Sequence, residues 1–271
     1  MTDVRVAGVD GVRERWVAVV LDGVPGPGDD PGRPGGVEVS WRVGAAADVL
    51  GLTHEVSAVG VDVPVGLVPT GRRACEGEAR RLLGRASSSV FDTAPQPAFG
   101  LARREGPRPG NRAAAEALAR AAGGTGISTQ AWMVAAKVLE VEAAVRTLGG
   151  TGERVVEVHP ETGFAVLAWA SGAAPPPSKR SAPGVAARVR LLAGGLPGLD
   201  VLDVLEALAR VPVGGRAADR VPVDDALDAL AAAWSAARHA RGGARVLGAA
   251  DAARAVWSDG APAPGRAVLV V

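Results

Sequence analysis

The chain begins with two largely apolar runs, residues 4–9 and 16–21, joined by a polar stretch that starts at Asp10. Valine and alanine dominate both runs, which is the pattern of buried β-strands. We therefore predict a β-hairpin that carries the carboxylate of Asp10 at its tip, with a turn over residues 11–15. A carboxylate at the end of a buried strand is costly unless a cation, a metal ion or a functional site compensates it. Asp10 therefore requires partners elsewhere in the chain.

A second acid occurs in the same setting further along the chain. The strand pattern of residues 57–67 contains one acid, Asp62, and Pro64 and Gly66 stop the strand just after it. Two predicted strands thus present a lone carboxylate near a C-terminal end. In open α/β sheets this is the edge where ligands bind.

Two later segments add further carboxylates. Residues 154–158 form a short strand pattern that includes Glu157 and is followed by His159 and the strand-ending Pro160. Residues 221–242 form a helix pattern with an apolar stripe at spacings of four, three, four and three, consisting of Val223, Leu227, Leu230, Trp234 and Ala237. Beside that stripe, in the first turns of the helix, lie Asp224, Asp225 and Asp228.

Carboxylates gathered from separate strands and a helix resist ionising together unless cations neutralise them. Hard oxygen ligands of this kind suit Mg²⁺ or Mn²⁺, and two such ions can hold the attacking and leaving oxygens of a phosphodiester. Taken singly, each acid has a structural alternative: Asp10 in a turn, Asp62 in an ion pair, and Asp224 or Asp225 in a helix cap. For His159, a hydrogen-bonded residue at a strand end is favoured over a ligand.

Composition narrows the class of protein. The chain has 271 residues with a net charge of +1, which counts against tight, non-specific binding of polyanions. A single cysteine, Cys75, excludes an internal disulfide and a multi-cysteine zinc site. No apolar run reaches the length of a membrane helix, so we expect a cytoplasmic protein without a membrane partner. Composition indicates no oligomeric state.

The remaining segments are predicted from their periodicity and their glycine and proline content. Residues 23–36 are too rich in glycine and proline to pack and predict a loop, followed by a strand over residues 37–43 and a short helix over residues 45–52. Further helices are predicted over residues 71–84, 112–122, 129–148 (after the cap Ser128), 183–193 and 201–209, with a loop over residues 85–99. Residues 267–271 predict one more edge strand.

Several motifs in one order resemble a known family. They are GVDG at residues 8–11, VDVPVGL at 61–67, GRRACEGEARRLLG at 71–84, STQAW at 128–132, EVHPE at 157–161, SKR at 178–180 and DDALDALAAAW at 224–234. Together they resemble the domain-of-unknown-function family 429, which is regarded as a set of predicted nucleases of the ribonuclease-H-like superfamily. The resemblance implies a single α/β domain over residues 1–271. Its mixed five-stranded sheet would have the first three strands antiparallel and flanking helices.

The resemblance also implies roles for the acids. Asp10 and Asp62 match the acids of the first and fourth strands, and Asp225 and Asp228 match a late helix, so these four would hold two metal ions. Glu157 matches an acid on the fifth strand whose role is less defined. On a helical wheel Asp224 lies about 40° and Asp225 about 60° from Asp228, so geometry leaves the choice between them open.

Between the fourth and fifth strands the resemblance implies a helical insert, about residues 71–150, that shapes the substrate pocket. Within it, Arg72 and Arg73 are candidate phosphate contacts and Gln130 is a further substrate-binding candidate. Lys179, on a later loop beside a serine, is another. The alternatives are an ion-paired, solvated helix face for the arginines and an exposed, solubilising lysine.

The leading hypothesis is a nuclease or phosphoesterase that depends on Mg²⁺ or Mn²⁺ and acts on nucleic acid or a nucleotide-like phosphate. A kinase or ATPase of the actin and sugar-kinase type would instead wrap a phosphate with the turn at residues 11–15. That turn contains one glycine, and no second glycine-rich loop follows. A non-catalytic binding protein on the same fold is the third hypothesis.

Overall fold

The computed structural model describes residues 3–26, 36–214 and 219–271, except for the side chain of Gln130. Most of the loop predicted over residues 23–36 therefore lies outside the described residues. The chain divides into two compact units, which are described one at a time. The first comprises residues 1–62, 148–245 and 270–271, and the second comprises residues 63–147 and 246–269.

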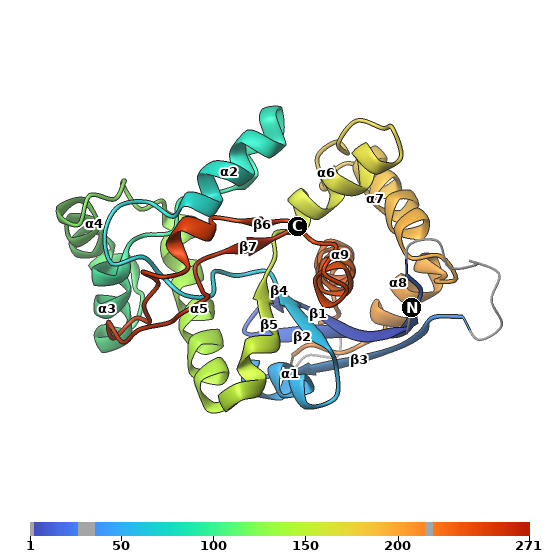
Figure 1. Ribbon diagram of the computed structural model, residues 1–271, viewed down its shortest axis with the longest axis horizontal. Coiled ribbons are helices and arrows are strands. Elements are labelled where there is room, and N and C mark those ends of the chain that lie inside the picture. Colours follow the sequence, from blue (N-terminus) through green and yellow to red (C-terminus); the bar gives the residue numbers. More distant parts are fainter. Residues whose placement is uncertain (1–2, 27–35, 215–218) are drawn as a thin grey trace. The chain divides into compact units, whose positions relative to one another are not determined.

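The first unit is built on a five-stranded sheet of order β3-β2-β1-β4-β5. Its strands are β1 (Val4–Val12), β2 (Arg15–Val24), β3 (Glu38–Gly44), β4 (Ala58–Val61) and β5 (Val155–Glu157). β2 pairs antiparallel with β1 and β3, whereas β4 pairs parallel with β1 and β5. A mixed five-stranded sheet flanked by helices, as predicted, is confirmed (Figure 1).

The burial of each strand follows its sequence. β1 and β4 are buried over most of their length, as near-continuous runs of valine, alanine and glycine predict for central strands. β3 reads EVSWRVG and is mostly exposed, which suits a strand at the edge of a sheet. Asp10 and Asp62 therefore come from the centre of the sheet.

The hairpin between β1 and β2 is tighter than predicted. β1 continues to Val12, which pairs with Arg15, so the turn is reduced to Arg13 and Glu14. Arg13 has φ of 51°, the left-handed conformation that two-residue hairpin turns require at their first position. Asp10 pairs with Val17 inside the ladder, so the expectation that its carboxylate lies at the hairpin tip is wrong.

The central helix of this unit is α9 (Val223–Ala240), which contacts β1, β2 and β4 (Figure 1). Its other sides contact α6 (Pro160–Ala170), α7 (Ala182–Gly195) and α8 (Val201–Leu208). Every residue from 226 to 237 is buried, so the helix is enclosed around its circumference rather than only along the predicted apolar stripe, and Asp228 and Ser235 are buried with the apolar residues. Within that stripe Val223 is 43% exposed, because it lies in the first turn before the helix enters the core.

The second unit is mainly helical. Its helices are α2 (Ala74–Leu83), α3 (Gln96–Glu105), α4 (Arg112–Ala121) and α5 (Thr129–Thr147). α2, α4 and α5 match predicted helices, and the backbone N–H of Ala131 donates to the hydroxyl of the predicted cap Ser128 at 3.0 Å. The start of α3 lies in the region predicted as a loop. Pro95 is the N-cap of this helix and Pro97 lies in its first turn, where the missing N–H costs no helical hydrogen bond.

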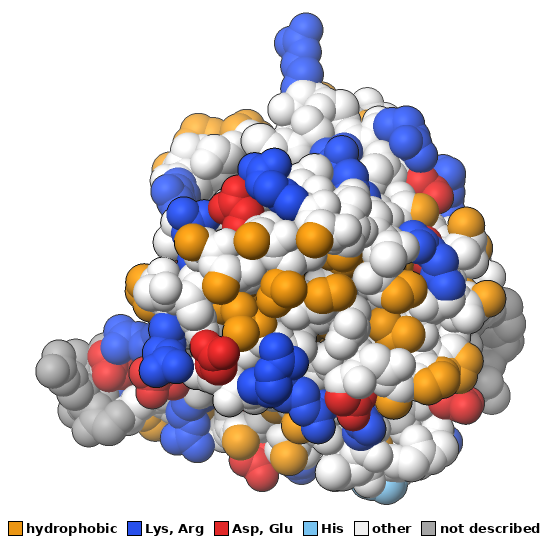
Figure 2. All heavy atoms as spheres, turned by 90° about the vertical axis from the view of Figure 1, so that its left-hand side faces the viewer, with side chains coloured by type: hydrophobic (Ala, Val, Ile, Leu, Met, Phe, Trp, Pro, Cys, Tyr) orange, Lys and Arg blue, Asp and Glu red, His pale blue; other side chains and the backbone are white. Residues whose placement is uncertain are grey.

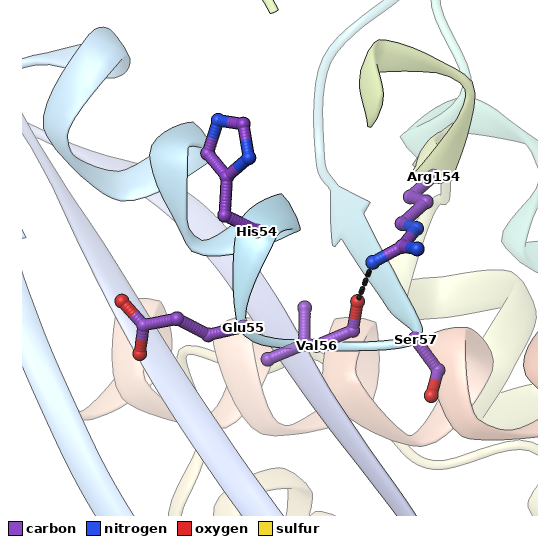
Figure 3. A pocket seen from close by; sticks show the side chains of 5 residues that line it. All are labelled: His54, Glu55, Val56, Ser57 and Arg154. Carbon is purple, nitrogen blue, oxygen red and sulfur yellow. Dashed lines mark hydrogen bonds between the residues drawn. The ribbon is translucent and has the colours of Figure 1, made fainter. Parts of the chain in front are cut away.

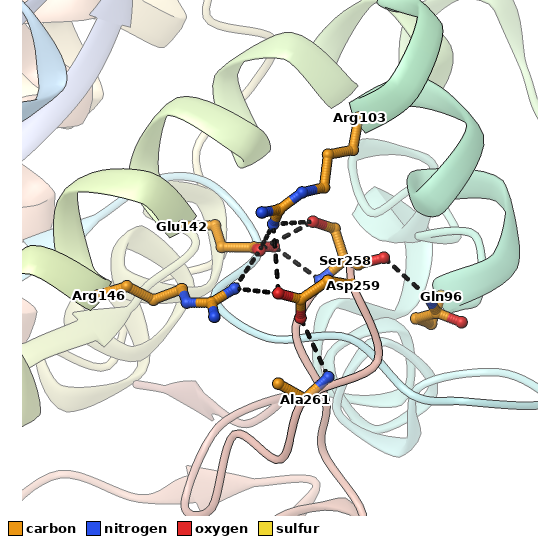
Figure 4. Close-up of polar contacts among 7 residues, drawn as sticks. All are labelled: Gln96, Arg103, Glu142, Arg146, Ser258, Asp259 and Ala261. Atoms are coloured by element: carbon orange, nitrogen blue, oxygen red, sulfur yellow. Dashed lines mark hydrogen bonds and ion pairs between the residues drawn. The ribbon is translucent and has the colours of Figure 1, made fainter.

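A buried carboxylate ties the C-terminal part of the second unit to its helices (Figure 4). Glu142 on α5 accepts hydrogen bonds from the backbone N–H and the hydroxyl of Ser258 at 2.9 and 2.8 Å. Arg103 on α3 donates to the same carboxylate at 3.1 Å. Glu142 and Ser258 are both buried, so this cluster has a structural role.

The short elements complete the chain. They are the helix α1 (Ala46–Leu50), the 3₁₀ helices η1 (Gly51–His54), η2 (Gly84–Ser89), η3 (Pro109–Asn111), η4 (Gly149–Arg154) and η5 (Ala249–Asp251), and the strands β6 (Val246–Leu247) and β7 (Leu269–Val270). The predicted C-terminal strand is present as β7, paired with β6 in a separate two-stranded sheet. Among the described residues, no helix is both long and apolar enough to cross a membrane.

Candidate functional site

Two glycines allow α9 to lie directly on the sheet. A Cβ atom added to Gly8 on β1 would lie 2.0 Å from the carbonyl oxygen of Ala229, and one added to Gly60 on β4 would lie 2.5 Å from that of Ala232. Real Cβ atoms do not approach backbone atoms this closely, so the helix can take its place only because both strands carry glycine here.

This register brings acids from three elements together. Asp10 and Asp62 follow the two glycines by two residues, so they point to the same side of the sheet, towards α9. Two strand residues advance by about 6.6 Å, and four helix residues advance by about 6 Å. Asp225 and Asp228 lie four residues before Ala229 and Ala232, the residues of α9 that the two glycines face. Asp10, Asp62, Asp225 and Asp228 are therefore displaced from these close contacts by similar distances and lie at about the same height along the sheet and the helix.

The pKa of Asp10 reflects the closeness of the other acids. Its side chain is nearly buried, and the backbone N–H of Gly11 donates to its carboxylate at 2.7 Å. Burial raises the pKa of Asp10 well above its usual range, and the charges of Asp62, Asp228 and Asp225 raise it further. A cation placed between these groups would relieve that repulsion.

Asp62 is held where β4 ends. Its backbone N–H donates to the carbonyl of Val9 at 3.1 Å, which fixes the residue beside Asp10. Burial raises the pKa of Asp62 well above its usual range, and so does the charge of Asp228. Glu157 contributes in the same direction from β5, where it is paired in register with Val61, the residue before Asp62. Glu157 therefore lies on the adjoining strand, beside the acid group formed by Asp10, Asp62, Asp225 and Asp228.

Lys179 meets the acid group from the loop between α6 and α7. Its ammonium donates to Oδ2 of Asp228 at 2.5 Å, and the Asp228 side chain is only 4% exposed. Burial raises the pKa of Asp228 and the charge of Lys179 lowers it, with a net increase. Burial lowers the pKa of Lys179, but Asp228, Asp10 and Asp62 raise it, so the ammonium stays charged. Lys179 is thus not a solvated surface lysine.

Asp225 and Asp224 differ in their relation to this group. The charge of Asp225 acts on Asp10, whereas Asp224 is not among the charges that chiefly shift Asp10, Asp62 or Asp228. Of the two neighbours that the sequence left open, Asp225 is therefore the one whose charge acts on Asp10.

Two residues near the site were not selected from the sequence. Arg188 on α7 is buried and forms a fork with Glu161 on α6, with both carboxylate oxygens at 2.7 Å from Nη2. Its guanidinium lies 5.2 Å from the ring centroid of Phe164. The charges of Glu161 and Arg188 act on Asp228 in opposite directions. The available signals were Glu161 in the EVHPE motif and the two arginines, Arg188 and Arg190, in the otherwise apolar sequence of α7.

The other predicted substrate contacts belong to the second unit. Arg72 forms an ion pair with Asp92 at 2.9 Å, and Arg80 shares the same carboxylate at 2.5 Å. Arg73 is 2% exposed and pairs with Glu76 at 3.3 Å, so as placed it presents no surface to a substrate. The side chain of Gln130 lies outside the described residues.

One open pocket lies at the opposite ends of β4 and β5. It is lined by residues 54–57 and Arg154, which precede the two strands (Figure 3). The guanidinium of Arg154 donates to the carbonyl oxygens of Thr53 and Val56 at 2.9 and 3.1 Å. Asp62 and Glu157 lie at the carboxyl ends of the same strands, so this pocket is separate from the acid group.

The carboxylates of the acid group are the donors that a hard cation prefers, but they are not gathered into a closed coordination site. Within residues 3–26, 36–214 and 219–271, no three His, Cys, Asp or Glu side chains are gathered closely enough to hold a metal ion. Asp228 Oδ1 is buried without a hydrogen-bond partner in the same ranges. An oxygen in that state fits a metal ligand, because burying an unsatisfied carboxylate oxygen is costly. The donor chemistry of these residues therefore suits a divalent ion, whereas their spacing in this structure does not yet form a closed coordination site.

Comparison with known proteins gives a family and no activity. The family model described as "Protein of unknown function (DUF429)" matches residues 8–253, which include all the acids of the site. No curated protein and no solved structure matches the chain.

Proposed function

Because this chain belongs to the DUF429 family, whose description names no activity, we propose its function from the site itself: divalent-metal-dependent hydrolysis of a phosphodiester, as a nuclease or phosphoesterase. We also propose that the sheet is of the ribonuclease-H-like type. In support, β1 to β3 are antiparallel in sequence order, and β4 joins β1 in parallel.

One observation carries the proposal: Asp10, Asp62 and Asp228 come from two strands and a helix, and besides burial the charges of Asp62 and Asp228 raise the pKa of Asp10 while the charge of Asp228 raises that of Asp62. A fold does not gather buried like charges without cost, so a compensating cation is part of the explanation. Carboxylate oxygens select Mg²⁺ or Mn²⁺ over softer metals. When bound, such an ion supplies an activated water and stabilises negative charge on a phosphoryl group.

The chain's own residues have separate tasks in this scheme. Asp10, Asp62 and Asp228 bind the ion, and Asp225, half-buried at the start of α9, completes its surroundings. The ammonium of Lys179 attracts the anionic substrate and stabilises the charge that develops on phosphoryl oxygens. The close packing of α9 on β1 and β4 keeps these groups in place before the substrate arrives.

The charge of the second unit favours an anionic substrate. Its segments, residues 63–147 and 246–269, contain 14 Arg and Lys residues against 9 Asp and Glu residues. Several arginines are paired, but Arg81, Arg85 and Arg104 are exposed. On the face that carries α3 and α4, basic side chains border exposed apolar atoms (Figure 2). Such a surface can contact phosphates without reading a base sequence.

The test is hydrolysis by the purified protein of labelled single-stranded and double-stranded DNA and RNA, a four-way junction, and bis(p-nitrophenyl) phosphate. Each substrate is incubated with EDTA, Mg²⁺ or Mn²⁺. We expect turnover with either metal ion, none with EDTA, and a loss of at least about a hundredfold in Asp10→Asn, because one ligand charge is removed.

Glu206→Gln is the matched control, since it also neutralises one acid but at a side chain that is 70% exposed on α8. Its turnover should equal that of the wild type. Turnover that survives EDTA, or full activity in Asp10→Asn, would contradict the proposal. So would the absence of metal-dependent hydrolysis across the whole panel.

A further inference from the structure

Lys179 places a positive charge inside the acid group. The side chain is 37% exposed, yet its ammonium contacts a carboxylate that is almost fully buried, Asp228. It also acts on Asp10 and Asp62. A lysine that merely solubilised the surface would extend into water and lose less side-chain entropy.

Hydrogen bonds of Ser181 and the close approach of Gly184 fix the turn that carries Lys179. The backbone N–H and the hydroxyl of Ser181 both donate to the carbonyl of Ser178, at 3.0 and 2.8 Å. The hydroxyl of Ser181 in turn accepts from the backbone N–H of Gly184 at 3.1 Å, which caps α7. A Cβ atom at Gly184 would lie 2.0 Å from the carbonyl oxygen of Ser178, so only glycine admits this turn.

Arg188 on α7 holds the same turn through a second set of hydrogen bonds. Its Nη1 donates to the carbonyl of Pro177, two residues before Lys179, at 2.7 Å. Its Nη2 is held by Glu161. A buried arginine that satisfies a loop carbonyl and a carboxylate at once leaves the loop few alternative positions. The ammonium of Lys179 is therefore placed by the fold.

The charges of the three acids that are proposed to bind the ion match one divalent ion beside the ammonium. Asp10, Asp62 and Asp228 carry three negative charges when ionised, and one ammonium and one divalent ion supply three positive charges. Asp225 and Glu157 lie around these three acids and are not ligands in this scheme. The two carboxylate oxygens of Asp228 differ in the same way, since one contacts the ammonium and the other is left for an ion. Its Oδ2 binds Lys179, whereas its Oδ1 is buried and has no hydrogen-bond partner in the described part of the chain.

We propose that the site binds a single divalent cation and that Lys179 supplies the second positive charge of what would otherwise be a metal pair. This inference rests on the proposed phosphodiester hydrolysis and replaces the expected pair of ions by one ion and one ammonium. Lys179 would then be the chain's own cation that stabilises the charge developing on the phosphoryl oxygens.

The experiment counts the Mn²⁺ ions bound by the metal-free full-length protein, by isothermal titration and by native mass spectrometry. The variants are Lys179→Met and Lys179→Gln, both neutral, so that the second remains if the first does not fold. Lys137→Met is the control, because Lys137 is the other lysine of the chain and lies on α5 in the second unit. We expect one ion in the wild type and the control, and two in both Lys179 variants.

Two ions in the wild type would overturn this inference and leave the proposed function standing. One ion in a folded Lys179 variant would also overturn it, because Lys179 would then not occupy the place of a cation. No bound ion in the wild type would overturn the proposed function together with the inference.

Discussion

Gly8→Ala is the substitution whose effect follows most directly from the geometry of the site. The added Cβ atom would lie 2.0 Å from the carbonyl oxygen of Ala229 and 2.1 Å from the amide nitrogen of Ala233. Both obstacles are backbone atoms of α9, so no side chain can rotate away. An ordinary contact begins near 3.4 Å, so α9 has to move off β1 by about 1.4 Å.

Overpacking of a well-packed core typically costs about 1–3 kcal/mol, and rigid backbone obstacles place this variant at the upper end, about 3 kcal/mol. For a chain of this size each kcal/mol lowers the melting temperature by about 2–4 °C, so we expect a fall of about 6–12 °C. Thermal and urea unfolding followed by circular dichroism and tryptophan fluorescence measure it. The same movement carries Asp228 away from Asp10, so stabilisation of the protein by Mn²⁺ should weaken.

Gly51→Ala is the matched control. Gly51 has φ of −57° and an added Cβ atom would meet nothing within 4 Å, so stability should stay the same or rise by about 0.4–1 kcal/mol. If Gly8→Ala unfolded at the same urea concentration as Gly51→Ala, the reasoning that glycine admits α9 to the sheet would be refuted.

Further predictions concern the pH dependence of stability and the support of Lys179. Burial and the charge of Asp228 raise the pKa of Asp62, so the folded protein keeps a proton that the unfolded chain has lost, and stability falls as the pH rises through that window. Asp62→Asn should therefore be more stable than the metal-free wild type above the pKa that Asp62 has in the folded protein, and this difference should vanish towards about pH 4, near the pKa of the unfolded chain. Urea unfolding measured at several pH values between these two pKa values tests it. A variant that is less stable than the wild type at every pH would contradict the raised pKa of Asp62. Arg188→Met breaks a buried pair, so it should cost about 3–5 kcal/mol in urea unfolding and speed hydrogen exchange over residues 177–181, whereas the exposed Arg190→Met on the same helix should do neither.

Much of the fold follows from local sequence patterns. Runs of valine and alanine predict the central strands, and helices over residues 112–122, 129–148 and 201–209 match α4, α5 and α8 closely. The errors arise where local signals compete with context. The prolines near residue 96 are typical of a loop, but Pro95 is the N-cap of α3 and Pro97 lies in its first turn. Asp10 reads as the start of a turn, although pairing with β2 continues two residues further.

The acids of the site could be selected from the sequence because charged residues are conspicuous in apolar strands. What the sequence could not indicate is the register of α9 on the sheet. That register depends on contacts between Gly8 and Gly60 and a helix far along the chain. The contact between Lys179 and Asp228 joins residues 49 positions apart, and its support by Arg188 is visible only after folding.

The central claim is that Asp10, Asp62 and Asp228 together hold a divalent cation, and crystals grown with Mn²⁺ test it most directly. Anomalous diffraction locates the ion without assumptions about its ligands. We predict one manganese peak with carboxylate oxygens of all three residues within about 2.0–2.6 Å, the range of hard-cation ligands, and Lys179 still bound to Asp228. Full Mn²⁺ saturation with no anomalous peak among these carboxylates would contradict the account.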